Sequence, residues 1–230
     1  MLTGAGISTD SGIPDYRGPN GLWTRDPDAE NLVTLSYYVA DPEIRRRAWL
    51  MRRDMGHLDV HPNAGHRALA DLERQGRLLA LITQNVDGLH QAAGSSAERV
   101  LEVHGTVPKV ECRPPAGARR ELASGGGAGV LGPACLRCGG ILKSATVSFG
   151  QELDERVLAA AAEAAADCDV FLAVGTSLQV WPVAGLTEIA PAHGARIVVV
   201  NAEPTPFDDL ADLVVREPIG TALPRLVARA

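Results

Sequence analysis

The sequence has few of the features that mark a membrane, secreted or nucleic-acid-binding protein. No apolar run approaches the roughly 20 residues that a membrane-spanning helix needs, and no charged segment followed by an apolar one marks a secretory signal. Lysine and arginine number 22 against 28 aspartate and glutamate residues, for a net charge of -6. Because nucleic-acid-binding surfaces are basic, we expect no nucleic-acid partner, no membrane partner and a cytoplasmic location.

Cysteine is scarce as well, with four in 230 residues. Cys135 and Cys138 form a C-x-x-C pair, Cys112 lies upstream of it and Cys168 downstream. In a chain without an export signal, this pattern indicates metal or redox chemistry before it indicates disulfides. The 46% of hydrophobic residues is ordinary for a globular protein, and the length suits one large domain or one domain with a small insertion.

Short apolar runs alternate with helical segments along most of the chain. Residues 78–83, 170–174 and 197–200 are apolar nearly throughout, as strands buried on both faces of a parallel sheet are. One face of an alanine-rich helix precedes the second run, at Leu153, Val157, Leu158, Ala161 and Ala165. This order predicts an α/β fold with a doubly wound, Rossmann-like parallel sheet.

A helical segment at residues 31–75 interrupts this alternation. Asp41 and Pro42 match a helix cap and a first helical position, and Asn63 opens a further helix that Gly76 closes. The segment has no strand pattern of its own. We therefore expect it to form a helical module outside the main sheet.

A second interruption, at residues 110–143, is rich in Gly, Pro and Arg and holds three of the four cysteines. Its glycine-rich stretch 125–129 is predicted to be mobile. We expect it to form a zinc-ribbon-like module, degenerate or intact, that packs with the helical module into a small second domain. The predicted large domain comprises residues 1–30, 76–109 and 144–230, and the small one residues 31–75 and 110–143.

Small or polar residues follow four predicted strands. Ligands of open α/β sheets lie at the carboxyl ends of the strands, where glycines let backbone N–H groups approach a phosphate. Each of these motifs could be a simple turn, but four of them together predict a ligand crevice. The residues concerned are Gly4, Ala5, Gly6, Gln84, Asn85, Asp87, Gly175, Ser177, Asn201 and Glu203.

The first of these motifs is not that of a hydride-transferring dehydrogenase. Such an enzyme has an acidic residue about 20 positions further on, at the end of a second strand. Here a polar loop with Asp15 and Arg17 follows instead. His104, between Val103 and Gly105, is a candidate general base because histidine titrates near neutral pH, although a lone histidine is more often structural.

Together these motifs resemble the sirtuin family, in its bacterial-type members. GAGIS, GIPDYRG, TQNVDGLH, VHGT, a C-x-x-C pair, VSFG, GTSLQV and VVVN occur in the order typical of that family and cover nearly the whole chain. The resemblance implies an NAD-dependent protein-lysine deacylase, which transfers the acyl group of an acyl-lysine to ADP-ribose and releases nicotinamide. The implied partners are acylated-lysine proteins or peptides. Two alternatives stay open: a mono-ADP-ribosyltransferase, and a degenerate NAD-binding module without turnover.

The resemblance also implies roles for individual residues. His104 would be the catalytic base, and Asn85 and Asp87, with Ile13, would form the nicotinamide pocket. Four residues would clamp the substrate peptide by β-augmentation: Val147, Phe149, Gly150 and Val180. The residues that bind NAD would be Gly4, Ala5, Gly6, Asp15, Arg17, Gln84, Asn85, Asp87, Gly175, Ser177, Asn201 and Glu203.

The chain departs from the family pattern at the expected zinc site. Family members carry two C-x-x-C pairs, but Pro115 stands where the second cysteine of the first pair should be. The remaining ligands would be Cys112, Cys135 and Cys138. Since structural zinc is nearly always four-coordinate, we expect either a decayed module or a weak three-thiolate site.

Two further departures concern the start and the acyl pocket. Only three residues precede Gly4, so we expect either a start further upstream or a missing central strand. Family members that remove succinyl groups use a Tyr-x-x-Arg pair. Arg52 is present here, but Trp49 takes the place of the tyrosine, which predicts a preference for neutral acyl chains such as acetyl.

Overall fold

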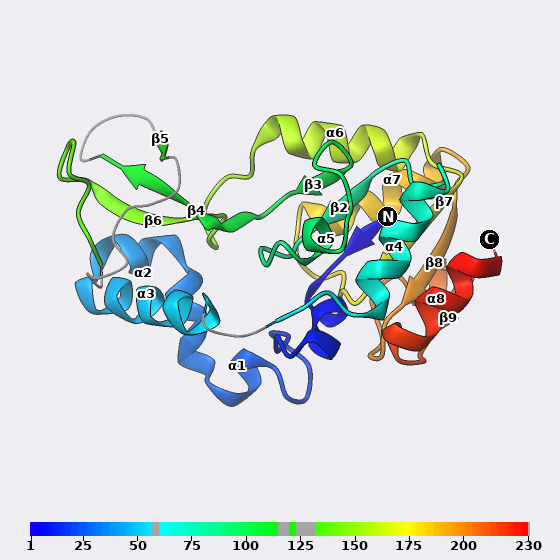
Figure 1. Cartoon of the computed structure of the whole chain (residues 1–230), viewed down its shortest axis with the longest axis horizontal. Helices are drawn as coiled ribbons and strands as arrows, with labels where there is room; N and C mark the ends of the chain where they lie inside the picture. Colours follow the sequence, from blue (N-terminus) through cyan, green and yellow to red (C-terminus); the bar gives the residue numbers. More distant parts are fainter. Residues whose placement is uncertain (57–59, 115–119, 123–131, 230) are drawn as a thin grey trace.

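The computed structural model describes residues 1–56, 60–114, 120–122 and 132–229. A parallel sheet in the order β3-β2-β1-β7-β8-β9 forms its centre (Figure 1). The chain fills one half of this sheet through β3 and then the other, which is the doubly wound, Rossmann-like α/β arrangement that the sequence predicts. The strands are β1 (Leu2–Thr3), β2 (Leu81–Thr83), β3 (Val100–Glu102), β7 (Val170–Val174), β8 (Arg196–Val200) and β9 (Leu213–Val215).

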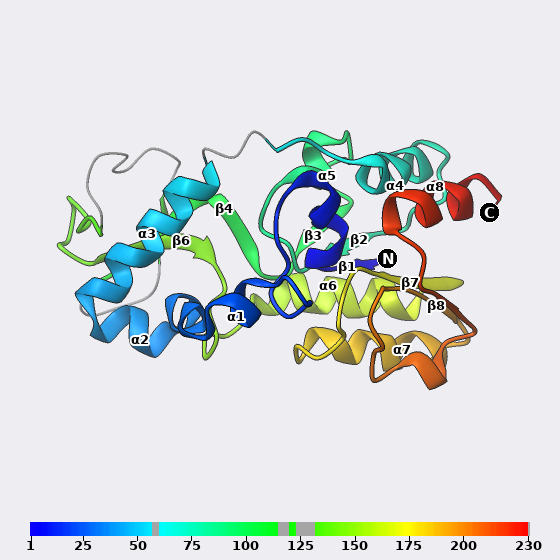
Figure 2. The same ribbon diagram turned by 90° about the horizontal axis from the view of Figure 1, so that it is seen from below.

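Helices cover both faces of this sheet (Figure 2). One pair, α4 (Ala64–Arg74) and α8 (Ile219–Arg229), packs on one face, and α6 (Glu155–Ala166) packs with α7 (Leu186–Ala192) on the other. A hydrophobic core lies on each face of the sheet, and successive residues of β7 point to opposite faces. Phe171 is buried in the core beneath α6 and α7, and Val174 is buried in the core beneath α4 and α8. This explains why the central strands are apolar nearly throughout.

The helix boundaries follow local signals in the sequence. The Asn63 side chain accepts hydrogen bonds from the backbone N–H groups of Gly65 and His66 and so caps α4. Gly76 follows that helix with a φ of 72°, a left-handed conformation that favours glycine. Pro42 is the first residue of α3, as predicted.

Helices α1 to α3 and the second interrupting segment lie together at one end of the molecule (Figure 1). Helix α4 was expected in the same helical module but packs on the main sheet, because Ala68 and Leu69 are buried against its strands. An antiparallel sheet, β5-β4-β6, is formed by β4 (Gly105–Arg113), β5 (Arg120–Leu122) and β6 (Ile141–Thr146). Beside it lie α1 (Leu22–Arg25), η2 (Pro27–Val33), α2 (Leu35–Ala40) and α3 (Pro42–Gly56). The Tyr38 hydroxyl donates to the Leu142 carbonyl 2.7 Å away, and Trp49 packs in a cluster with Leu142. The division into two domains at the predicted boundaries stays a prediction.

The expectation of a missing central strand is wrong. Leu2 pairs with Ile82 on one side and Ala173 on the other, and Thr3 pairs with both neighbouring strands in the same way. The strand is too short for a periodic pattern, but its backbone completes the sheet between β2 and β7. Leu2 is fully buried.

Two other expectations can be set against the structure. The glycine-rich stretch 125–129, predicted to be mobile, lies outside the described residues. Within the described ranges, no helix has the length and apolar character needed to cross a bilayer.

Candidate active site

A cavity of about 770 Å³, called the main cavity below, opens at the carboxyl ends of β1, β2, β7 and β8 and reaches the small antiparallel sheet. Its volume is in the range of small-molecule sites, about 300–1,000 Å³. The four strand ends that the sequence singles out all border it. They contribute Gly4, Ala5, Gly6, Gln84, Asn85, Gly175, Ser177, Asn201 and Glu203.

Two glycine loops touch each other at the floor of the main cavity. The N–H of Gly6 donates to the Gly175 carbonyl 2.8 Å away. A Cβ on Gly6 would lie 2.8 Å from the Gly175 Cα, and one on Gly175 would lie 2.4 Å from the Ile7 nitrogen. Gly175 also has a φ of 59°, in the left-handed region. Side chains are therefore excluded here, and bare backbone borders the cavity.

His104 borders the main cavity between the two sheets, just before β4. Its Nδ1 lies 3.2 Å from the carbonyl oxygen of Gln84. A carbonyl oxygen only accepts, so Nδ1 carries the proton and Nε2 has the free lone pair. Burial lowers the pKa of His104, against the opposing effect of the hydrogen bond to Gln84. The ring is therefore a neutral base at pH 7.

Asn85 and Asp87 follow β2 but occupy different positions. The Asn85 amide donates to the Gly4 carbonyl and to the Ser8 hydroxyl, each 3.1 Å away, and its side chain borders the main cavity. Asp87 is not among the residues that border this cavity. It accepts from Ser8 at 2.7 Å and from the Leu89 N–H at 2.9 Å. Asp87 thus holds Ser8, which in turn holds Asn85.

The polar loop after the first glycine motif also reaches the main cavity. Arg17 lies 4.4 Å from the centroid of the Trp23 ring, and Trp23 lies 5.6 Å from the Phe149 ring, centroid to centroid. Asp15 accepts a hydrogen bond from the Gly18 N–H, which folds the loop on itself. The loop therefore presents a cation and an aromatic face to the cavity.

The predicted peptide-binding residues Val147, Phe149, Gly150 and Val180 all border the main cavity. The segment after β6, residues 147–150, forms no continuous strand and is joined to neighbouring segments by individual backbone hydrogen bonds. Val147 N–H donates to the His104 carbonyl, Phe149 N–H to the Val33 carbonyl, and Leu35 N–H to the Phe149 carbonyl. The backbone of this segment is therefore hydrogen-bonded to the backbone of His104, the candidate base.

A model of the Sir2 family matches residues 4–182. The chain belongs to the Sir2 family. It is 63% identical over 230 residues to NAD-dependent protein deacetylase 2 of Streptomyces coelicolor, covering 99% of this chain and 95% of that protein. It is 42% identical over 231 residues to NAD-dependent protein deacylase 2 of Archaeoglobus fulgidus, covering 99% of this chain and 88% of that protein.

Solved Sir2 structures have the same fold. One, a mutant Sir2 homologue in complex with ADP-ribose, superposes with a TM-score of 0.88 at 36% identity, covering 99% of this chain and 89% of that one. Another contains a deacetylated p53 peptide and 3'-O-acetyl ADP-ribose, with a TM-score of 0.86 at 32% identity, covering 100% and 92%. The family assignment made from the sequence motifs is thereby confirmed.

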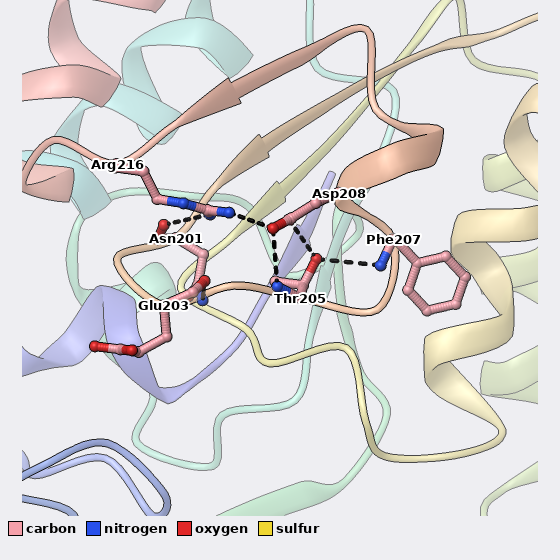
Figure 3. Close-up of polar contacts among 6 residues, drawn as sticks. All are labelled: Asn201, Glu203, Thr205, Phe207, Asp208 and Arg216. Carbon is pink, nitrogen blue, oxygen red and sulfur yellow. Dashed lines mark hydrogen bonds and ion pairs between the residues drawn. The ribbon is translucent and has the colours of Figure 1, made fainter.

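In this Sir2 chain, the loop after β8 is held by a polar cluster (Figure 3). Arg216 donates to the Asn201 carbonyl 2.8 Å away and also pairs with Asp208. The Asp208 carboxylate accepts a hydrogen bond from the Thr205 hydroxyl at 2.7 Å. Burial alone would raise the pKa of Asp208, but the hydrogen bonds from Thr205 and Arg216 outweigh burial and lower it. The Glu203 carboxylate points away from this cluster (Figure 3), and Glu203 borders the main cavity.

The three cysteines expected as metal ligands come together in the small antiparallel sheet. The ligand atoms of Cys112, Cys135 and Cys138 all lie within 4.8 Å of one another. The pKa of Cys135 is lowered to about 7, mainly by a hydrogen bond from the backbone N–H of Arg137. Burial raises the pKa of Cys112 to about 12. Three thiols at this spacing fit a soft metal such as zinc. Cys168 is only partly buried, against the α6/α7 core.

Several residues at the Sir2 cavity are not found by reasoning from the sequence. Thr176 accepts a hydrogen bond from the Gln84 amide at 2.9 Å and borders the cavity; its position between two candidate residues was the available signal. Tyr38 was not found either, and it lines the end nearest the small sheet together with Trp49 and Arg52, which the resemblance had placed at the acyl pocket. Helical spacing does not predict what Tyr38 covers.

Proposed function

We propose that the chain is an NAD-dependent protein-lysine deacylase that removes acetyl groups. The main support for this proposal is the position of His104. Its Nδ1 is hydrogen-bonded to the Gln84 carbonyl, and the residue borders a cavity at the ends of four strands. The named relatives and the solved Sir2 complexes with ADP-ribose and with peptide support the proposal. NAD would occupy the sheet end of the main cavity, with acyl-lysine at the end nearest the small sheet.

When bound, NAD would supply the ribose carbon that bonds to the acyl oxygen as nicotinamide leaves, and the ribose hydroxyl that then attacks the acyl carbon and takes the acyl group. His104 would accept a proton at Nε2 from a ribose hydroxyl. Because Nδ1 is already hydrogen-bonded, the ring cannot turn to offer the wrong nitrogen. A positioned general base contributes about 10²–10⁴-fold to a rate.

Asn85 would orient the nicotinamide ring, and it is well fixed for that task. Its amide nitrogen is held by Gly4 and Ser8, and Ser8 is held by Asp87. Confining a leaving group in a reactive geometry can remove a large part of a barrier that is otherwise entropic. In this assignment Asp87 acts through Ser8 and Asn85 rather than by contact with the ring.

The acyl-lysine would enter between the segment around Phe149 and the residues around Val180. Both segments border the main cavity, and an extended peptide can add backbone hydrogen bonds there. Protein partners, in place of nucleic acid or membrane, and a cytoplasmic location are part of this proposal. The net charge of -6 and the small number of basic residues support the choice of partners.

One assay separates this proposal from the two alternatives. The protein is incubated with NAD and an acetyl-lysine peptide, and the products are separated by mass spectrometry. O-acetyl-ADP-ribose, absent from a His104→Ala reaction, is the expected product. Nicotinamide release with ADP-ribose attached to protein would instead indicate a mono-ADP-ribosyltransferase. Binding of NAD without any product would indicate a degenerate module.

A further inference from the structure

A tight turn at residues 148–151 borders the main cavity next to the expected peptide-binding segment. The Gln151 N–H donates to the Ser148 carbonyl 2.9 Å away and closes the turn. Gly150 has a φ of 78°, the left-handed conformation that the third residue of such a turn can require. The turn therefore holds the Gln151 side chain beside the place proposed for the substrate.

The Gln151 side chain bonds to the backbone of Ser148 as a peptide group of a neighbouring strand would. Its Oε1 accepts a hydrogen bond from the Ser148 N–H at 3.4 Å. The N–H groups of the residues on either side, Val147 and Phe149, donate to other segments instead. Because a backbone N–H can only donate, the amide must turn its oxygen towards Ser148, which leaves Nε2 to donate elsewhere.

The Nε2 group of Gln151 lacks an acceptor. It is buried, and none of the residues that the structure describes accepts a hydrogen bond from it. A buried N–H group without an acceptor is rare, because it costs free energy, so a missing partner is to be expected. Since Gln151 borders the main cavity, a molecule bound there can supply the acceptor.

We propose that Gln151 is a substrate-binding residue, whose Nε2 donates a hydrogen bond to a main-chain carbonyl oxygen of the acylated protein. In a β-sheet, a peptide group accepts from one neighbouring strand and donates to the other. The Gln151 amide accepts from Ser148 and has its donor left for the substrate. Every substrate protein has main-chain carbonyls, so this contact adds affinity without selecting a sequence. The inference rests on the proposed deacylase function.

Gln151→Glu tests the contact, because glutamate keeps an oxygen for the Ser148 N–H but has no N–H to donate. We expect KM for an acetyl-lysine peptide to rise roughly 3–10-fold, as for the loss of one hydrogen bond, with kcat and KM for NAD nearly unchanged. Gln151→Met, which adds no charge, should raise the peptide KM in the same way. Gln75→Glu, on the exposed surface at the end of α4, is the matched control and should keep wild-type constants.

A set of substrate peptides locates the acceptor. Each peptide carries one ester in place of a peptide bond near the acetyl-lysine, which weakens that carbonyl as an acceptor. At one position the ester should raise KM more in the wild type than in Gln151→Glu, because the variant has already lost the contact. Ester effects that are the same in both proteins at every position would overturn the proposal, and so would an unchanged peptide KM in Gln151→Glu.

The wild type separates a failure of this inference from a failure of the proposed function. If the wild type deacetylates the peptide and both Gln151 variants match it, only the role of Gln151 is wrong. If the wild type gives no product from an acetyl-lysine peptide and calorimetry detects no binding of that peptide, the proposed function is wrong and this inference with it.

Discussion

The Nδ1 atom of His104 lies 3.2 Å from the carbonyl oxygen of Gln84, the residue that follows β2. The amide of Gln84 in turn donates to Thr176, which follows β7. The candidate base is therefore tied to two strand ends of the parallel sheet, although it lies next to the small antiparallel sheet. This linkage fixes the ring orientation before any ligand binds.

Replacing His104 with alanine should lower kcat by about 10²–10⁴-fold, because a general base is lost. NAD binding, measured by calorimetry, should change little, since His104 forms only one part of the cavity wall. The pH profile gives a second check. Because burial lowers the pKa of His104 from 6.5, the acidic limb of kcat/KM should lie below pH 6.5 in the wild type. Deacylation by His104→Ala at the wild-type rate would remove this residue from the mechanism.

His90 should make stability depend on pH. Burial, with a contribution from His66, lowers the pKa of His90 to about 3, against 6.5 for a free histidine. Between these values the unfolded chain binds a proton that the folded protein excludes. The free energy of unfolding should therefore fall as the pH drops from 6.5 towards 3, by about 1.4 kcal/mol per pH unit for each such group.

Urea unfolding of the wild type and of His90→Gln between pH 4 and 7 measures this effect. The slope should be shallower by about 1.4 kcal/mol per pH unit in the variant, whatever its stability at pH 7. Parallel curves for His90→Gln and the wild type would refute the assignment.

The acyl preference depends on Arg52. Its guanidinium lies 4.8 Å from the centroid of the Trp49 ring and 3.5 Å from the Pro108 carbonyl, and it borders the main cavity. Trp49 offers no hydroxyl to complete a carboxylate clamp, so kcat/KM should be higher for an acetyl than for a succinyl peptide of the same sequence. Arg52→Met should leave acetyl turnover within a few fold. A succinyl preference in the wild type that disappears in Arg52→Met would show that Arg52 recognises a carboxylate.

Arg216 should matter for NAD affinity rather than for chemistry. It holds the loop after β8 through the Asn201 carbonyl and Asp208 (Figure 3). Arg216→Ala should raise KM for NAD by roughly 5–10-fold, as expected for the loss of one or two charge-assisted hydrogen bonds, with kcat nearly unchanged. Arg225→Ala is the control, because Arg225 pairs with Glu217 on the exposed surface. Equal KM values for the two variants would exclude this role.

The main sheet could be predicted because β7 and β8 are buried on both faces and their sequences show it. Helix starts were also predictable where one side chain decides them, as Asn63 does for α4. The strand β1 could not be predicted, since two residues carry no periodicity. The apolar run 78–83 contains only the short strand Leu81–Thr83, and Leu79 before it is 47% exposed. Hydropathy alone does not show at which residue of an apolar run the strand begins.

The site was predictable only where residues follow a strand directly. Motif order placed Asn85 and Asp87 together, but Gly88, with a φ of 73°, turns the chain so that the Asp87 carboxylate meets the Leu89 N–H. The part of the cavity at Tyr38 and Trp49 depends on how two helices dock on the small sheet. That docking is set by contacts between segments far apart in sequence, which a local pattern does not record.

One backbone feature has a bearing on substrate range. Phe149 is bonded through its main chain to Val33 and Leu35, and Val147 is bonded to His104 in the same way. These bonds fix the distance from the base to the edge where a peptide would lie. A substrate that adds to this edge would be held by its own peptide groups, which are the same in every protein. We expect the enzyme to be tolerant of the side chains that flank a modified lysine. Its choice among cellular proteins would then depend on which lysines lie in unfolded, exposed chain segments.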